Sequence, residues 1–180
     1  MSEIYIEHIN KENVSLIQDF CTVKNEKDND YFKSYLMYNG LLDSEQGMAK
    51  TKLYIEEDDN GHKKILGFYS IRCSSLIMDS GEGSEKMGEP ALGIVELAVH
   101  KDYRNQGIGT AMMKNIIATA YELKEKYLGL KHLVVCAKET AKTYYEKFKF
   151  AELPGYKQIP RNTDNQGCIG MSLSLKIKYI

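Results

Sequence analysis

The order of segments along the chain predicts one α/β domain with a mixed sheet. Apolar runs that alternate or are rich in β-branched residues, as in strands, are interspersed with segments of helical periodicity. No internal repeat and no linker of biased composition divides them. A chain of 180 residues is long enough for one domain with a full core and short for two. We therefore expect a single domain over residues 1–180.

The N-terminal third predicts one strand and two helices. Residues 3–9 alternate between two faces, as in a strand. Apolar residues at helical spacing over residues 14–20 predict a short helix capped by Asn13. Residues 28–42 carry aromatic side chains at helical spacing, which predicts a second helix that ends at Gly40. Such an aromatic stripe belongs more often to a core than to a binding pocket.

A hairpin and a connecting loop follow. Residues 51–57 and 64–77 read as two strands joined by a turn that contains Asn60-Gly61, a strong hairpin signal. Residues 78–90 are rich in Gly, Ser and Glu and predict a loop. Loops of this kind connect elements or supply substrate-binding lids.

The second half of the chain alternates strands and helices. Residues 91–99 predict the central strand and residues 108–123 an amphipathic helix with one apolar face. Residues 131–137 predict a strand, residues 139–147 a helix, and residues 167–177 a last strand.

The turn between the central strand and the long helix carries the most informative motif. Its sequence, Arg104 to Gly109, places two glycines at a helix entrance, where backbone N–H groups and the helix dipole favour an anion. A P-loop would need lysine after the second glycine, but Thr110 stands there. A dinucleotide fingerprint would need a third glycine at Met112. Both familiar nucleotide loops are thus excluded, and a phosphorylated cofactor of another kind is expected.

The Arg-x-x-Gly-x-Gly pattern between a strand and a helix resembles the GNAT N-acetyltransferase superfamily, which binds acetyl-CoA there. The resemblance extends through residues 134–137 and 141–150, and it covers roughly residues 50–150, the expected cofactor-binding core. It implies a mixed, mostly antiparallel sheet of six to seven strands flanked by about four helices. It also implies that acetyl-CoA is the co-substrate and that the acetyl group passes directly to an amine. The first two helices would cover the acceptor pocket, and the chain could form a homodimer.

The same resemblance assigns cofactor contacts. The backbone of the central strand pairs with the pantetheine arm, and the N–H groups of the turn hold the pyrophosphate. Both glycines would let the phosphate approach closely, and Arg104 would either add charge or brace the turn. The residues implied are Leu97, Ala98, Val99, Arg104, Asn105, Gln106, Gly107, Ile108, Gly109, Thr110 and Tyr145.

Two residues are candidates for acid–base chemistry. Tyr145 matches the family tyrosine that protonates the departing thiolate, with Tyr144 as the neighbour that one residue of misalignment would select. Lys149 replaces the glycine usual near the end of this helix, which puts the geometry of that end in question. Glu96 is the only carboxylate within the central strand and is the candidate base. Strand alternation leaves its face open, and a water chain is the alternative base.

The composition of the chain narrows the classes of protein to which it can belong. The chain has 24 Lys and Arg against 25 Asp and Glu, which argues against a nucleic-acid partner because such proteins carry a basic excess or face. No run approaches the ~18 apolar residues of a membrane span, and the acidic N-terminus is unlike a secretory signal. The four cysteines form no CxxC pair and are expected to be reduced thiols of a cytoplasmic protein. The four histidines show no metal-ligand spacing, so no metal is expected.

The leading hypothesis is an N-acetyltransferase that moves the acetyl group of acetyl-CoA to a primary amine of a small molecule or protein. One alternative is a toxin-type member of the family that acetylates aminoacyl-tRNA, which Asp19-Phe20-Cys21 and residues 28–36 loosely resemble. Another is a non-catalytic domain that binds acetyl-CoA as a sensor or offers an interaction surface. The acidic side chains of the 78–90 loop suit a cationic acceptor, although Lys86 lies among them.

Overall fold

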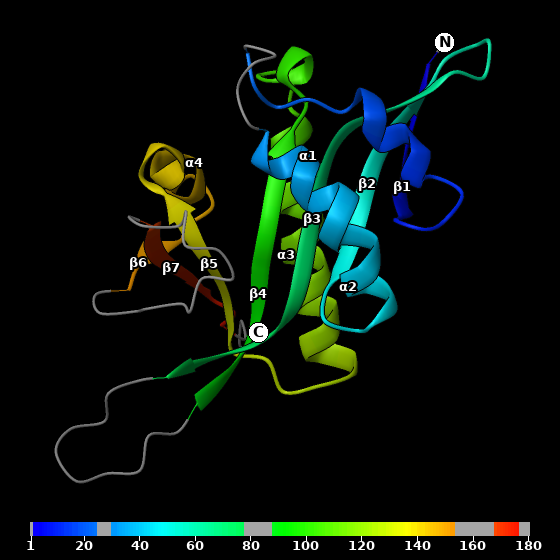
Figure 1. Cartoon of the computed structure of the whole chain (residues 1–180). Helices are drawn as coiled ribbons and strands as arrows, with labels where there is room; N and C mark the ends of the chain where they lie inside the picture. Colours follow the sequence, from blue (N-terminus) through cyan, green and yellow to red (C-terminus); the bar gives the residue numbers. More distant parts are fainter. Residues whose placement is uncertain (1, 25–29, 78–87, 154–167, 177–180) are drawn as a thin grey trace, which may run out of the picture. The chain divides into compact units, whose positions relative to one another are not determined.

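The computed structural model describes residues 2–24, 30–77, 88–153 and 168–176 (Figure 1). Its strands are β1 (Glu3–His8), β2 (Lys50–Glu57), β3 (Lys63–Ile77), β4 (Gly88–Val99), β5 (His132–Lys138), β6 (Ala151–Glu152) and β7 (Cys168–Ser174). They form one seven-stranded sheet in the order β1-β2-β3-β4-β5-β7-β6. The strands β4 and β5 run parallel, whereas β1–β2, β2–β3, β5–β7 and β6–β7 are antiparallel. The expected mixed sheet with a central β4 is confirmed.

Helical segments alternate with these strands. They are the 3₁₀ turns η1 (Val14–Asp19), η3 (Lys101–Tyr103) and η4 (Glu139–Ala141), the π-helical turn η2 (Leu36–Gly40), and the α-helices α1 (Tyr31–Tyr35), α2 (Leu41–Glu45), α3 (Ile108–Lys126) and α4 (Lys142–Glu146). The long helix α3 extends the predicted amphipathic segment by one turn.

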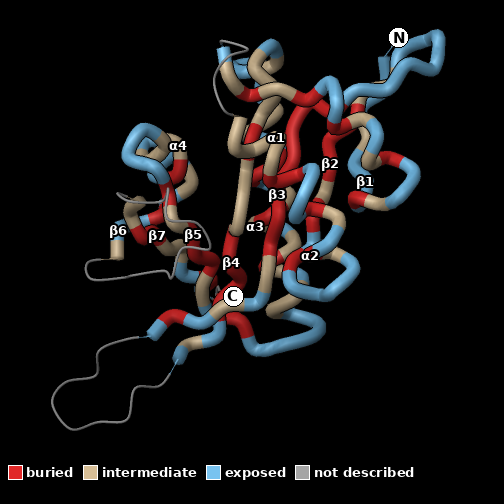
Figure 2. Tube along the Cα trace, viewed as in Figure 1, coloured by how far each residue is buried: buried red, intermediate tan, exposed pale blue. Residues whose placement is uncertain are grey.

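The chain packs into two compact units. The first comprises Met1–Arg72 and Val95–Lys114, and the second comprises Cys73–Ile94 and Asn115–Ile180. In the first unit the buried core gathers apolar side chains from β2 and β3 with those of η1 and α1, as the continuous buried segments of β2 and β3 in Figure 2 show. Its members are Ile9, Ile17, Phe20, Tyr35, Leu36, Leu53, Ile55, Ile65, Phe68 and Ala98.

Aromatic packing fixes α1 in this core. The Tyr35 ring stacks on Phe68 with a centroid distance of 6.0 Å, and Phe20 meets the same Phe68 ring edge-on at 5.6 Å. The opposite face of β3 approaches the start of α3, because a Cβ on Gly67 would lie 2.9 Å from Ala98 O and 3.1 Å from Met112 Cε. Glycine at this position therefore allows a backbone approach that any side chain would prevent.

Two predictions for the N-terminal helices need correction. The first helix is a 3₁₀ turn, and Asn13 precedes it without capping it through its side chain. The Asn13 amide instead donates to Glu7 Oε2 and His8 O. The second helical segment does not end at Gly40, because η2 leads directly into α2. Glycine inside this segment lets Ile9 Cδ1 approach, since a Cβ there would lie 3.3 Å from it.

The hairpin is confirmed, and residues 88–90, predicted as part of the following loop, belong to β4. Strands β2 and β3 pair antiparallel, and Gly61 adopts a φ of 79° in the connecting turn. Strand β4 begins at Gly88, three residues before the predicted start. Residues 78–87, which make up most of the predicted loop, lie outside the described residues.

The second unit contains the parallel ladder of β4 with β5 and the antiparallel pairing of β5 with β7. The expectation of reduced thiols is wrong for Cys136 and Cys168, which form a disulfide with a Cα–Cα distance of 5.5 Å. They lie 32 residues apart, so only the pairing of β5 with β7 brings them together. Cys21 and Cys73 are free. Gly167 and Ile177, the predicted ends of the last strand, lie outside the described residues.

Candidate active site

The turn before α3 has the conformation that its glycine predicts. Gly107 adopts a φ of 89°, in the left-handed region, and the preceding Asn105 adopts 62°. A Cβ on Gly107 would meet no atom within 4 Å, so backbone conformation rather than packing requires glycine here. The Gly107 carbonyl then accepts the N–H of Ala111 and begins the helix. Gly109 already lies inside α3 and has no positive φ, so this conformational reason does not extend to it.

Arg104 braces the turn, which is one of the two roles expected for it. Its Nη2 donates to the carbonyl oxygen of Thr22. Gln106 contributes a second brace from within the turn, since its Nε2 donates to Asp102 O at 2.9 Å. The ammonium of Lys64 lies 4.9 Å from the centroid of the Tyr103 ring, which supports the segment just before the turn.

The part of β4 that was expected to contact the cofactor lies beyond the last residue pair between β4 and β5. The parallel pairing of β4 with β5 runs from Ala91–His132 to Ile94–Val135 and does not continue among the described residues. Leu97, Ala98 and Val99 form the last part of β4 beyond that point.

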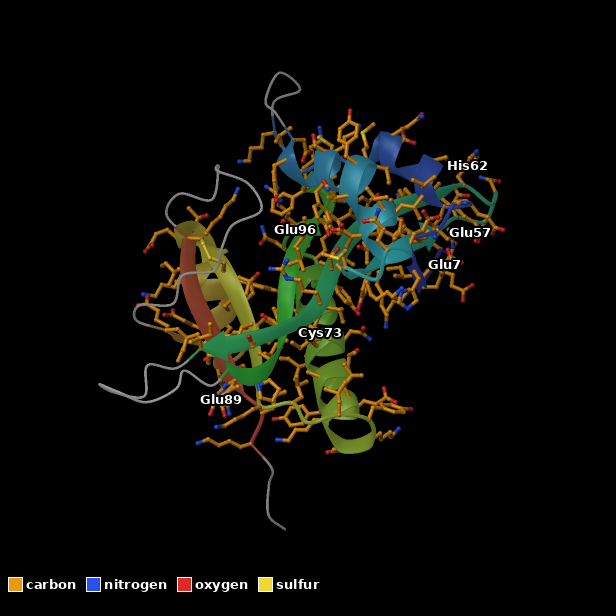
Figure 3. The ribbon with its side chains drawn as sticks, turned by 60° about the horizontal axis from the view of Figure 1, so that its bottom comes forward. Glu7, Glu57, His62, Cys73, Glu89 and Glu96 are labelled. Atoms are coloured by element: carbon orange, nitrogen blue, oxygen red, sulfur yellow. A yellow bond between two sulfur atoms is a disulfide. The ribbon has the colours of Figure 1, made fainter. Side chains whose placement is uncertain are left out.

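Glu96 faces α1. Tyr31, the first residue of α1, donates its hydroxyl to Glu96 Oε1 at 2.6 Å. The carboxylate is half-buried, and Figure 3 labels it on β4. A carboxylate in this position can accept a proton and still keep one hydrogen bond that fixes its orientation.

The tyrosines of the predicted aromatic stripe divide between core and surface. Tyr35 is buried, and its hydroxyl lies 3.5 Å from Asp43 Oδ2. Burial raises the pKa of Tyr35, opposed by hydrogen bonds with Ser70 and Thr51. Tyr38 is 70% exposed. The Tyr31 hydroxyl meets Glu96, a candidate catalytic residue, and Tyr35 also interacts electrostatically with Glu96.

A cavity of about 610 Å³ lies beside the turn and includes residues that sequence reasoning did not select. Its lining includes Cys21, Asp30, Lys33, His100 and Lys101. Cys21, Asp30 and Lys33 belong to the segments that loosely resemble toxin-type members, whereas His100 and Lys101 carry no motif. Asp30 could also have been found as an aspartate directly before a helical aromatic stripe, which is a recognisable N-cap pattern.

In the second unit, Tyr145 lies on α4 and is 6% exposed. Its ring packs edge-on against Phe150 at 5.5 Å and against Tyr144 at 5.1 Å. Burial raises the pKa of the neighbouring Tyr144. The Tyr145 ring is therefore packed inward, and Tyr144 beside it is half-buried.

Glu89, which belongs to the acidic segment suggested for a cationic acceptor, is already engaged within the second unit. Its Oε2 lies 2.6 Å from His132 Nε2, and its Oε1 accepts from Lys131 (Glu89 is labelled in Figure 3). These two hydrogen bonds, opposed by a smaller desolvation effect, lower the pKa of Glu89. The other acidic residues of that segment, Glu82 and Glu85, lie outside the described residues.

Within the described ranges, no three His, Cys, Asp or Glu side chains gather as metal ligands would. None of the helices in the described parts of the chain is long and apolar enough to cross a membrane.

Residues 49–152, more than half of the chain, match the family model of the acetyltransferase (GNAT) domain. The chain therefore belongs to the GNAT acetyltransferase family.

Solved structures share its fold over nearly the whole length. A tyrosine-to-phenylalanine mutant of KacT has a TM-score of 0.71 at 17% identity, covering 96% of this chain and 95% of that one. AtaT complexed with acetyl-methionyl-tRNAfMet has a TM-score of 0.74 at 14% identity, with coverage of 96% and 95%. AtaTR bound with acetyl-CoA has a TM-score of 0.68 at 17% identity, with coverage of 96% and 93%. At these identities the likeness shows the fold. No curated protein matches the sequence.

Proposed function

We propose that the protein is an N-acetyltransferase that transfers the acetyl group of acetyl-CoA directly to a primary amine. The observation that carries this proposal is the turn at Gly107, which opens a 19-residue helix. It follows η3 and the strand β4, whose ladder to β5 ends at Ile94. Family membership supports the same activity.

In this proposal the turn and the last part of β4 hold the cofactor. The pyrophosphate accepts hydrogen bonds from N–H groups of residues 105–110, where the positive end of the α3 dipole adds attraction. The pantetheine arm pairs with the backbone of residues 97–99 as an added strand would. Holding two reactants in the right orientation can by itself lower the activation free energy by ~7–11 kcal/mol.

The chemistry needs three proton transfers. Glu96 takes a first proton from the acceptor ammonium, directly or through water, so that the amine nitrogen can attack the thioester carbonyl. A new C–N bond forms, the C–S bond breaks, and the thiolate leaves with the electron pair of that bond. Tyr145 supplies the proton to the thiolate, which is the role implied by its match to the family tyrosine. The nitrogen releases its second proton to water, and the Tyr145 hydroxyl regains a proton from water.

A second candidate acceptor is the α-amino group of an aminoacyl-tRNA. The likeness to AtaT covers the N-terminal third as well as the core, and AtaT has been solved with acetyl-methionyl-tRNAfMet. The formal net charge of −1 weighs against this candidate, because tRNA binding requires many phosphate contacts. The two candidates share the same reaction and differ only in the amine.

Calorimetric titration with acetyl-CoA tests the cofactor site. Wild-type protein should bind with micromolar affinity, and Gly107→Val should lose that binding because valine cannot adopt the φ of 89° without strain. Gly129→Val is the matched control, since a Cβ there also meets no atom within 4 Å and no positive φ is recorded for it. Failure of the wild type to bind acetyl-CoA would refute the proposed function.

The acceptor is then identified by thiol release. Wild-type protein with acetyl-CoA would be given spermidine, an aminoglycoside, a lysine peptide and aminoacyl-tRNA in turn. Activity on tRNA that falls steeply between 50 and 200 mM salt, together with growth arrest on expression, would select the second candidate. Normal growth with high yields of wild-type protein would eliminate it.

Tyr145→Phe separates an enzyme from a non-catalytic acetyl-CoA sensor. If the hydroxyl protonates the thiolate, the turnover number should fall ~10²-fold while acetyl-CoA affinity stays close to wild type. Tyr144→Phe is the control, because it removes a hydroxyl from the adjacent half-buried ring. An unchanged turnover number in Tyr145→Phe would remove Tyr145 from the mechanism.

A further inference from the structure

Three hydrogen bonds fasten residues 19–23, here called the N-terminal strap, to the segment that leads into the cofactor turn. His100 Nε2 lies 3.2 Å from Asp19 O, and Lys101 N donates to Cys21 O at 2.8 Å. Arg104 Nη2 donates to Thr22 O. Since a carbonyl only accepts, Nε2 of His100 carries its proton, which agrees with Nδ1 accepting the N–H of Asp102 at 3.3 Å.

The strap in turn holds the start of α1. Thr22 is buried, and it donates to the Asp30 carboxylate through its N–H at 2.5 Å and its hydroxyl at 2.7 Å. Asp30 is the N-cap of α1 and accepts the N–H of Lys33 at 3.1 Å. Tyr31 follows immediately and donates to Glu96 Oε1 at 2.6 Å.

These contacts form one continuous path within the first unit, from the cofactor turn to the candidate base. It runs from Arg104 through Thr22 and Asp30 to Tyr31 and Glu96. Two of its steps, Arg104–Thr22 and Tyr31–Glu96, join residues 82 and 65 positions apart, and the Thr22–Asp30 step joins residues 8 positions apart. A hydroxyl delivered from the first turn of a capped helix has little freedom to move, so the carboxylate that it contacts is held in one orientation.

We propose that Tyr31 is a positioning residue for Glu96, and that Thr22 and Asp30 fix Tyr31 through the strap that the cofactor turn holds. This inference rests on the proposed function and deepens it. The path also makes the orientation of Glu96 depend on the segment that binds the cofactor.

A double-mutant cycle with Tyr31→Phe and Glu96→Gln tests the proposal on the amine of the thiol-release panel that gives the highest kcat/KM. Tyr31→Phe should lower kcat roughly tenfold, the value expected for a hydrogen bond to a charged group, with acetyl-CoA affinity unchanged. Because Tyr31 acts through Glu96, the double variant should be no slower than Glu96→Gln alone. Tyr127→Phe is the control, since this tyrosine is 71% exposed beyond the end of α3.

A second readout needs no acceptor. The pH midpoint of the ¹³C signal of the Glu96 carboxyl should move to higher pH in Tyr31→Phe, because the hydroxyl stabilises the charged carboxylate. Thr22→Val, which removes only the hydroxyl that contacts Asp30, should move the midpoint in the same direction by a smaller amount.

Three outcomes would overturn the proposal: an unchanged midpoint in Tyr31→Phe, additive losses in the double-mutant cycle, or full activity of Glu96→Gln. In each case a wild type that still binds acetyl-CoA and releases thiol would leave the proposed function standing. Failure of the wild type in those two assays is instead a failure of the proposed function.

Discussion

Asp30 shows how much one side chain contributes to this site. Its carboxylate accepts hydrogen bonds from the backbone and hydroxyl of Thr22 and from the backbone N–H groups of Lys33 and Val23. Desolvation alone would raise the pKa of Asp30, but these hydrogen bonds outweigh it and lower the pKa. The folded state therefore favours the ionised form of the Asp30 carboxyl.

This gives a pH-dependent prediction. A carboxyl whose pKa is lower in the folded state contributes stability that is present above its unfolded pKa, about 3.9. That stability is lost as the pH falls through the folded pKa. Urea unfolding should show Asp30→Asn about 1 kcal/mol less stable than wild type at pH 7, with the difference shrinking below about pH 4. Glu12→Gln, an exposed control, should show no such trend. A difference that stays constant down to pH 3 would contradict the assignment.

At the scale of elements, the turn that follows α4 contains a lysine in the left-handed conformation that usually takes glycine. Lys149 adopts a φ of 66°. The N–H of Lys149 donates to Glu146 O at 2.9 Å, and the N–H of Phe150 donates to Tyr145 O at 3.3 Å. This is the Schellman pattern, which usually has glycine at the left-handed position. Although Lys149 stands where the family usually has glycine, this helix end makes both hydrogen bonds of the Schellman pattern.

Lys149→Gly should therefore stabilise the protein. A left-handed conformation costs an L-residue roughly 1–2 kcal/mol, and glycine removes that cost at the expense of a more flexible unfolded chain. We expect a gain of about 1 kcal/mol in the free energy of unfolding, measured with urea. Lys147→Gly should destabilise instead, since Lys147 has a right-handed φ of −58°. Loss of stability in Lys149→Gly would show that the lysine side chain has a stabilising role of its own.

The disulfide of Cys136 and Cys168 joins β5 to β7 and closes a segment of 32 residues. In the chain-entropy account a loop of this length stabilises the folded state by about 3–4 kcal/mol. Reduction with dithiothreitol, or Cys136→Ser with Cys168→Ser, should therefore lower the free energy of unfolding by that amount. Replacement of the free Cys21 and Cys73 by serine should leave the effect of dithiothreitol intact. Equal stability with and without reductant would refute this prediction.

For the molecule as a whole, binding of acetyl-CoA at the turn of Gly107 is coupled to folding. A ligand that binds only the folded protein stabilises it by mass action. Acetyl-CoA binding should accordingly be visible in the unfolding of the full chain.

Acetyl-CoA at a concentration of about 100 Kd should stabilise the chain by ~2.7 kcal/mol. For a protein of this size that corresponds to a rise in Tm of roughly 5–10 °C, measured by calorimetry. Gly107→Val should show no rise, whereas Gly129→Val should behave like the wild type. A rise of equal size in Gly107→Val would place the cofactor elsewhere.

Several parts of this picture were predictable from local sequence. The hairpin at Asn60-Gly61 and the turn at Gly107 depend on residues whose backbone preferences are strong and local. The alternation of strands and helices followed from apolar periodicity, because each buried element must present one continuous apolar face. The continuation of the helical segment through Gly40 was missed, since the contact with Ile9 that favours glycine there is tertiary.

The sequence by itself determined the fold class, the order of elements and the glycine turn, because periodicity and backbone preference act over a few residues. Only the tertiary structure decided that Glu96 faces Tyr31, that Arg104 braces Thr22 and that Cys136 meets Cys168. These partners lie 32 to 82 residues apart. No local preference specifies such pairs; they follow from the register of strands and the packing of helices once the chain has folded.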